Sequence, residues 1–235
     1  MDDLESELGR ARSLSVSDLA DAIEAIGFKC TGCGACCRST TCGDEDGGES
    51  ESSEQGDQPT VEKHTATVFP EEVRQLQERG DYDWRDVARP MPYGLSEGPD
   101  GPRGETFEWA LQTDSCGDCT FYDGDQNGGV CTIYGDRPLI CQTYPFSVAL
   151  GGTSQPMGDA VDAEGMVRAH ECEGLGREMS REAAEELAAT LKRRAVRELE
   201  EAIGVRDGYE PTDAPTEDVV VYDSEGPKRP DGTPR

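Results

Sequence analysis

Apolar residues recur at helical spacing in three segments of the chain, which predicts three helices. The first follows a capping serine, Ser15 or Ser17, and stops at Gly27. The second covers residues 69–80 and has a proline suited to its first turn. The third and clearest covers residues 180–204, between a capping serine and a glycine that offers a left-handed stop.

Shorter patterns between these helices predict strands. In the segment TFEWALQ, one side of a half-buried strand carries Phe107, Trp109 and Leu111. Residues 119–134, CTFYDGDQNGGVCTIY, predict a hairpin around a turn rich in Gly, Asp and Asn. The segment RPLICQTYPF has two prolines and predicts a turn with irregular helix. We therefore expect an α+β, loop-rich domain with a β-hairpin, flanking helices and a long C-terminal helix.

The predicted domain covers residues 15–204; one polar stretch interrupts it and a second follows it. Residues 43–60 contain a run without apolar residues and predict a disordered acidic insertion. Residues 205–235 are rich in Pro, Gly and Asp and predict a mostly disordered tail, with one short strand at VVVY.

The balance of charge narrows the choice of partners. The chain has 50 Asp and Glu against 22 Lys and Arg, which gives a net charge of -28. Nucleic acid and anionic membrane surfaces would be repelled, so neither is an expected partner. Because the acid is spread along the whole chain and lysine is scarce, the composition indicates a protein adapted to concentrated salt, where screening removes self-repulsion.

Whether the ten cysteines bind metal or form disulfides depends on the cellular compartment of the protein. No run approaches the roughly 18 apolar residues of a membrane-spanning helix, and the start MDDLESELGR lacks the features of a secretory signal. We therefore expect a cytoplasmic protein, whose thiols are kept reduced, and interpret the cysteines as metal ligands in preference to disulfides. An apolar content of 34% is lean for a core, so a metal would be a useful staple.

The cysteines form two groups along the sequence: Cys30, Cys33, Cys36, Cys37 and Cys42, then Cys116, Cys119, Cys131, Cys141 and Cys172. A two-residue gap lets two sulfurs reach one zinc ion at about 2.3 Å. Cys36 and Cys37 are adjacent; in an extended chain they would point to opposite sides, which predicts more than one metal. The bacterial ferredoxin pattern is not satisfied, because Thr40 occupies its fourth cysteine position.

Three stretches, FKCTGCGACCR, CTFYDGDQNGGVCTIYGDRPLICQTYPF and HECEGLG, resemble the YkgJ-type cysteine-cluster family, also described as a CxxCxxCC zinc- or iron-chelating domain. The resemblance covers roughly residues 28–176 and implies metal chelation. The family's recurring cysteines would fall on Cys30, Cys33, Cys36, Cys37, Cys119, Cys131, Cys141 and Cys172. Some relatives are linked to flagellin lysine methylation, but no glycine-rich cofactor loop here supports that role.

Eight thiolates divide into two four-sulfur sites, for which zinc is the favoured metal; iron or an iron–sulfur cluster, used for electron transfer or redox sensing, is the alternative. Arg137 is the best candidate to offset the charge of such a site. Cys42 and Cys116 are interpreted as free thiols or spare ligands, and His170 as a surface residue that could replace a sulfur.

We find no catalytic residues and no cofactor-binding motif in the sequence. There is no nucleophile elbow and no P-loop, and two histidines give little material for a triad. Non-enzymatic metal binding is therefore favoured, and an enzyme that acts on a protein side chain and uses the thiolate domain as a scaffold remains a third class.

Overall fold

The computed structural model describes residues 3–39, 65–99, 101–125, 128–150, 160–162, 164–211 and 218–235, and it has the predicted α+β fold. The α-helices are α1 (Leu4–Ser13), α2 (Val16–Ile26), α3 (Pro70–Arg79), α4 (Trp84–Val87), α5 (Leu139–Thr143) and α6 (Arg181–Gly208), with short 3-10 helices η1 (Ala35–Cys37) and η2 (Tyr134–Asp136). The strands are β1 (Thr67–Val68), β2 (Ala88–Pro90), β3 (Leu95–Gly98), β4 (Gly101–Phe107), β5 (Trp109–Leu111), β6 (Tyr122–Asp125), β7 (Gly128–Cys131), β8 (Phe146–Val148), β9 (Ala160–Asp162), β10 (Val167–His170), β11 (Val219–Asp223) and β12 (Gly226–Lys228).

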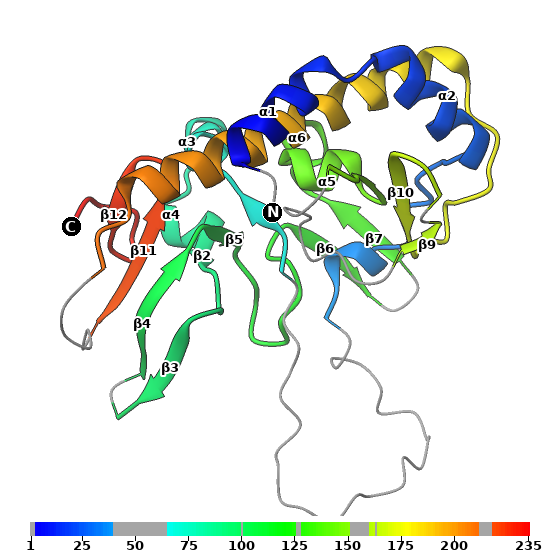
Figure 1. Ribbon diagram of the computed structural model, residues 1–235. Coiled ribbons are helices and arrows are strands. Elements are labelled where there is room, and N and C mark those ends of the chain that lie inside the picture. The colour runs from blue at the N-terminus through cyan, green and yellow to red at the C-terminus, as the bar shows by residue number, and fades with distance from the viewer. Residues whose placement is uncertain are drawn as a thin grey trace, which may run out of the picture.

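A layer of helices covers one side of the molecule, where α1 and α2 pack along the long helix α6 (Figure 1). Helix α2 begins at Ser15, whose hydroxyl oxygen accepts a hydrogen bond from the Asp18 N–H at 3.2 Å, and ends at Gly27 with φ of 75°. Ser180 caps α6 in the same way by accepting from Ala183. The predicted starts of both helices are thus confirmed, and so is the helix at α3.

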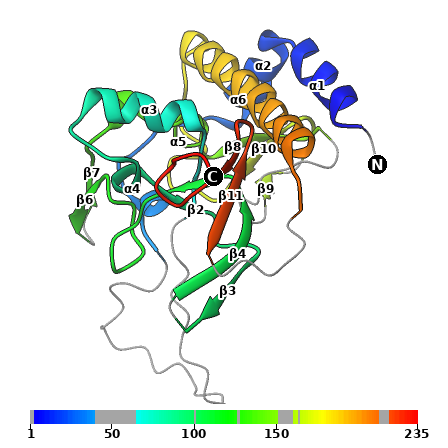
Figure 2. The same cartoon turned by 90° about the vertical axis from the view of Figure 1, so that its left-hand side faces the viewer.

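Beneath the helices lie four small sheets, with strand orders β1-β5-β2, β8-β10-β9, β12-β11-β4-β3 and β6-β7. Strand β11 comes from the C-terminal part of the chain and pairs in parallel with β4, so that the last strands complete a sheet begun more than a hundred positions earlier in the sequence (Figure 2). The predicted hairpin of residues 119–134 is confirmed as β6 and β7, which pair antiparallel from Tyr122 opposite Cys131.

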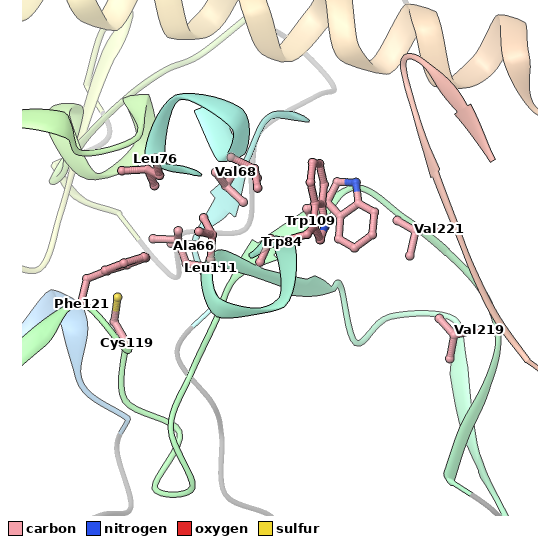
Figure 3. Close-up of a cluster of buried hydrophobic side chains, with 13 residues drawn as sticks. Ala66, Val68, Leu76, Trp84, Trp109, Leu111, Cys119, Phe121, Val219 and Val221 are labelled. Atoms are coloured by element: carbon pink, nitrogen blue, oxygen red, sulfur yellow. The ribbon is translucent and has the colours of Figure 1, made fainter. Parts of the chain in front are cut away.

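The largest core cluster surrounds two tryptophans. The rings of Trp84 and Trp109 meet edge to face with centroids 5.0 Å apart. Figure 3 shows Cys119 and Phe121 at one end of this cluster and Val219 and Val221 at the other. The core is therefore shared by the C-terminal strand and by one of the predicted metal ligands.

A buried ion pair fixes the C-terminal strands to this core. The side chain of Asp223 is fully buried, accepts a hydrogen bond from the Trp109 indole N–H at 2.8 Å and forms an ion pair with the Lys228 ammonium at 2.9 Å. A buried charge of this kind is tolerated only when it is paired and hydrogen-bonded. Each of the three groups therefore depends on the others.

The predicted strand TFEWALQ is wrong as a single element. The backbone of Glu108 adopts φ of 64°, a left-handed conformation that is uncommon outside glycine, and the chain turns from β4 into β5. As a result Phe107 is exposed, whereas Trp109, Ala110 and Leu111 are all buried.

The predicted end of the long helix at Gly204 is also wrong, because α6 continues to Gly208. A Cβ atom at Gly204 would lie less than 3.0 Å from Ser224, so this glycine allows the close approach of another segment. The predicted strand at VVVY is confirmed as β11, which is buried along its whole length. The rest of the expected disordered tail is wrong where α6 continues to Gly208 and where β12 covers Gly226–Lys228. The predicted insertion, residues 43–60, lies outside the described residues.

No helix in the described part of the chain combines the length and the apolar character needed to cross a bilayer.

Candidate metal centre

Four segments that lie far apart in the sequence line one cavity of about 1120 Å³. They are the loop that follows α2 and ends in η1, the hairpin with the loop before it, helix α5, and the loop that follows β10. Together they contribute all eight predicted ligands: Cys30, Cys33, Cys36, Cys37, Cys119, Cys131, Cys141 and Cys172.

Two glycines shape the first of these loops. Gly32 and Gly34 have φ of 71° and 73°, so both occupy the left-handed region that favours glycine. Gly34 is buried, and a Cβ atom there would lie less than 3.0 Å from the ring of Tyr122 in β6. The Gly34 carbonyl accepts a hydrogen bond from the Cys37 N–H at 2.8 Å, which closes the turn of η1. The close contact with Tyr122 holds this loop, residues 27–37, against the hairpin. We call it the cysteine loop.

Backbone hydrogen bonds hold the two ends of this loop against two different partners. At its end, the Cys119 N–H donates to the Cys37 carbonyl at 2.8 Å. At its start, the Lys29 N–H donates to the Gly174 carbonyl at 3.0 Å, which brings the loop that carries Cys172 alongside the residues before Cys30. The loop thus joins the hairpin to the segment after β10.

Helix α5 carries Cys141 and is held from behind by α6. The guanidinium of Arg194, which is only 2% exposed, donates to the Thr143 hydroxyl at 3.0 Å and to the Phe146 carbonyl at 3.1 Å. These bonds join the last residue of α5 and the first residue of β8 to the long helix. The position of Cys141 therefore depends on a buried charge in the long helix.

One part of the centre is buried against the core cluster around Trp84 and Trp109, which we call the tryptophan core. Cys119 is 6% exposed, and Cys37 and Cys141 pack against the same cluster. Burial raises the pKa of the Cys119 thiol to about 11 and that of Cys131 above its ordinary value. Burial also raises the pKa of Cys141, and the neighbouring thiols of Cys119, Cys36 and Cys131 raise it further. We call Cys37, Cys119, Cys131 and Cys141 the inner cysteines.

The remaining thiols lie toward solvent. Cys30 and Cys36 are exposed, and Cys33 and Cys172 are half-buried. The Gly174 N–H donates to the Cys172 sulfur at 3.4 Å. Burial raises the pKa of Cys172, and the charges of Cys33, Cys36 and Cys30 add to that effect, because these thiols are its neighbours. We call Cys30, Cys33, Cys36 and Cys172 the outer cysteines.

The expectation that Cys36 and Cys37 point to opposite sides is wrong. These residues form a 3-10 turn and not an extended chain, and their sulfurs lie 3.9 Å apart. At this separation the two thiolates can either share one ion or bind one ion each of a neighbouring pair. The hydrogen bond between the two thiols lowers the pKa of Cys36 to about 7 and raises that of Cys37, since the pair holds one shared proton tightly.

Arg137 lies beside the thiols, as predicted. Its guanidinium stacks over the Tyr134 ring, 3.8 Å from the centroid, and donates to the Tyr134 carbonyl at 3.0 Å. The positive charge of Arg137 lowers the pKa of Cys131 and of Cys141, where burial has the larger and opposite effect, and it also lowers that of Cys36. Arg137 is the one cation among the described residues that line the cavity.

The donor set fits a thiophilic metal, but the sulfurs do not converge on one point. Among the described residues, no three His, Cys, Asp or Glu side chains are arranged to hold a single ion. Soft thiolates suit zinc, copper and iron–sulfur clusters, so the chemistry of the lining agrees with the predicted metals. Coordination of one ion by four of these thiols requires side-chain rotation within the cavity.

Besides the eight predicted ligands, the sequence offers three further residues of interest: Cys116, His170 and Cys42. Cys116 is not a free thiol, because it is disulfide-bonded. His170 is not a surface residue: it is 6% exposed, its Nε2 lies 2.9 Å from the Ser147 hydroxyl, and it does not line the cavity. Cys42 lies outside the described residues.

Residues 29–173 match the family model CxxCxxCC, described as "Putative zinc- or iron-chelating domain". The chain belongs to this family. The CxxCxxCC match contains all eight cysteines that line the cavity, and it confirms the resemblance carried by the three cysteine-bearing stretches. Comparison with curated proteins and with solved structures finds no match. The CxxCxxCC description supports metal binding and leaves open which metal is bound.

Proposed function

We propose that the protein binds two thiophilic metal ions, with zinc favoured, through two four-thiolate sites. The inner cysteines, Cys37, Cys119, Cys131 and Cys141, supply one site, and the outer cysteines, Cys30, Cys33, Cys36 and Cys172, supply the other. The observation that supports this proposal is that eight thiols from distant segments line a single cavity. Four thiolates fill the coordination shell of zinc and leave no open position, which suits structural closure or sequestration and not catalysis.

Electrostatics and packing favour this division. Four thiolates around one divalent ion carry a net charge of −2, which a neighbouring cation should offset. Arg137 is suitably placed for the inner site, because its guanidinium lies 3.5 Å from the Cys141 carbonyl. Cys119 and Phe121 are part of the tryptophan core, so metal binding by the inner cysteines would be coupled to folding of that core.

Elemental analysis of anaerobically purified protein tests the proposal, with two zinc ions per chain as the expected result. Cys33→Ser should lower the zinc content by one ion and make the loop after α2 more sensitive to protease. Thr31→Ser is a matched control in the same loop, because it changes an exposed residue that carries no thiol. Full metal content in Cys33→Ser would show that the assignment of the outer site is incorrect.

An iron–sulfur protein for electron transfer or redox sensing is the second candidate. It is favoured by the spacing of the thiols, because a cluster of several irons spans more space than one ion, and no three described ligands are close enough for one ion. Anaerobic purification separates the two candidates. Brown protein that contains iron and inorganic sulfide supports the cluster, and colourless protein with bound zinc supports the first candidate.

We also infer that the acidic composition adapts the protein to concentrated salt. The net charge of -28 causes self-repulsion in dilute buffer, and salt screens it over about 3 Å at 1 M. Unfolding measured against potassium chloride concentration tests this inference. Full native structure and unchanged stability in dilute buffer would contradict it.

A further inference from the structure

We propose that the outer cysteines exchange their metal with a thiol-bearing acceptor, while the inner cysteines retain theirs. The outer ion would then be cargo, and the inner ion a permanent part of the fold. This inference rests on the proposed function, because it assigns different roles to the two proposed sites.

Access is the first reason. Cys30 and Cys36 are exposed, so an entering ligand can approach the outer site directly. Cys119 is 6% exposed and is covered by the core that contains Phe121. Ligand exchange at a filled four-coordinate site needs an entering group to reach the ion, and Cys30 and Cys36 are the exposed thiols among the eight that line the cavity.

Support from the backbone is the second reason. Each inner cysteine is held by regular structure or by a backbone bond: Cys37 lies in η1, Cys131 in β7 and Cys141 in α5, and the Cys119 N–H donates to the Cys37 carbonyl. In contrast, Cys30 and Cys33 lie in residues 29–34, which belong to no helix or strand, and Cys172 lies in the loop after β10. Cys36 differs from these three, because it lies in η1 beside Cys37. Loss of Cys30, Cys33 or Cys172 as a ligand therefore disturbs a loop, whereas loss of one inner ligand disturbs paired elements.

Charge is the third reason. Glu171 and Glu173 line the cavity on either side of Cys172, and Arg137 lines it near Cys141. The partner of Glu173 is Arg177, at 3.9 Å in an exposed pair, which offsets little of its charge. Carboxylates next to the outer cysteines attract an incoming cation, but they add like charge to a filled thiolate site. The outer site is therefore built for capture and release, and the inner site for retention.

The exchange itself involves no oxidation. A thiol of the acceptor loses its proton and binds the ion as a thiolate, and the Cys30 thiolate leaves the ion and takes up a proton. No electron is transferred, and the charge of the ion does not change. Repetition at the other outer cysteines would complete the transfer.

A chelator challenge of the full chain loaded with two zinc ions tests the proposal. Glutathione serves as the thiol acceptor, and a chromogenic chelator reports zinc release. We expect a fast phase and a slow phase of one ion each. Cys30→Ser should abolish the fast phase only, and Cys141→Ser should abolish the slow phase and lower the midpoint of thermal unfolding more than Cys30→Ser does.

A second measurement avoids the risk that Cys141→Ser does not fold. After one ion has been removed from the unaltered protein, iodoacetamide should label the four outer cysteines and leave the inner four unlabelled. Release of both ions in one phase, or early labelling of Cys119 or Cys141, would overturn the proposal of unequal exchange while leaving two-site binding intact. Protein that binds no zinc would instead refute the proposed function, and this inference with it.

Discussion

Replacement of Gly34 by alanine should weaken metal binding by displacing the cysteine loop from the hairpin. Two costs contribute. A residue with a Cβ atom in a left-handed conformation costs about 1–2 kcal/mol. The added methyl would also lie less than 3.0 Å from the Tyr122 ring, and relief of such overpacking costs about 1–3 kcal/mol. The ring has little room to move, because Cβ atoms placed on Gly124 and Gly129 would also lie less than 3.0 Å from it.

Gly32→Ala provides the matched control. Gly32 has φ of 71°, almost that of Gly34, and nothing lies within 4 Å of a Cβ placed there. The two variants therefore share the conformational cost and differ in the contact with Tyr122. Since metal binding is coupled to the position of the loop, a difference of about 1–3 kcal/mol corresponds to roughly 5- to 150-fold in zinc affinity.

Competition with a chromogenic chelator measures these affinities. We expect Gly34→Ala to bind zinc more weakly than Gly32→Ala, and the additional change Tyr122→Ala to restore most of the difference. Equal affinities for the two alanine variants would show that the contact between the loop and the hairpin does not position the thiols.

Two further predictions concern the charges that hold the fold. Lys228→Met should lower the free energy of unfolding by about 3 kcal/mol, because it leaves Asp223 buried without its cation. Urea denaturation followed by tryptophan fluorescence measures this loss, and Asp223→Asn in the same chain should recover part of it. A loss below about 1 kcal/mol would contradict the proposed role of the ion pair. A hydrogen bond from Arg74 holds the pKa of Glu225 at about 2, below its ordinary value of 4.5, so its stabilising contribution is present above 4.5 and lost as the pH falls through about 2. The difference in stability between the unaltered protein and Glu225→Gln should therefore shrink over that range, and a constant difference would refute this assignment.

The local signals for helices were readable in the sequence, and the failures came from contacts between distant segments. Ser15 and Ser180 act as caps whatever they pack against, so both helix starts were predictable. Gly204 looks like a helix stop in the sequence, but the reason for a glycine there is the close approach of Ser224, which is a tertiary contact. The sequence predicts the strand at VVVY, but its parallel pairing with β4 is a contact between distant segments that the local pattern does not contain.

The candidate ligands were predictable for a different reason. Spacing alone predicts a metal site at Cys30, Cys33, Cys36 and Cys37, because cysteine is rare and its chemistry is specific. The family resemblance adds Cys119, Cys131, Cys141 and Cys172, and all eight line the cavity. Spacing could not indicate which thiols neighbour one another, because that depends on the 3-10 turn at Cys36 and Cys37 and on the position of α5 against α6. The burial of His170 was hidden for the same reason, since its partner Ser147 lies on another strand.

The pairing of β11 with β4 also means that the segment matched by the family model is shorter than the segment that folds together. The family match ends at residue 173, and a fragment cut at the limits of that match would lack α6, which supports α5, and β11, which supplies Val221 to the tryptophan core. Such a fragment would keep all eight thiols that line the cavity and yet lose much of the scaffold that positions them. In this protein the borders recognised by similarity are therefore poor places at which to divide the gene for expression.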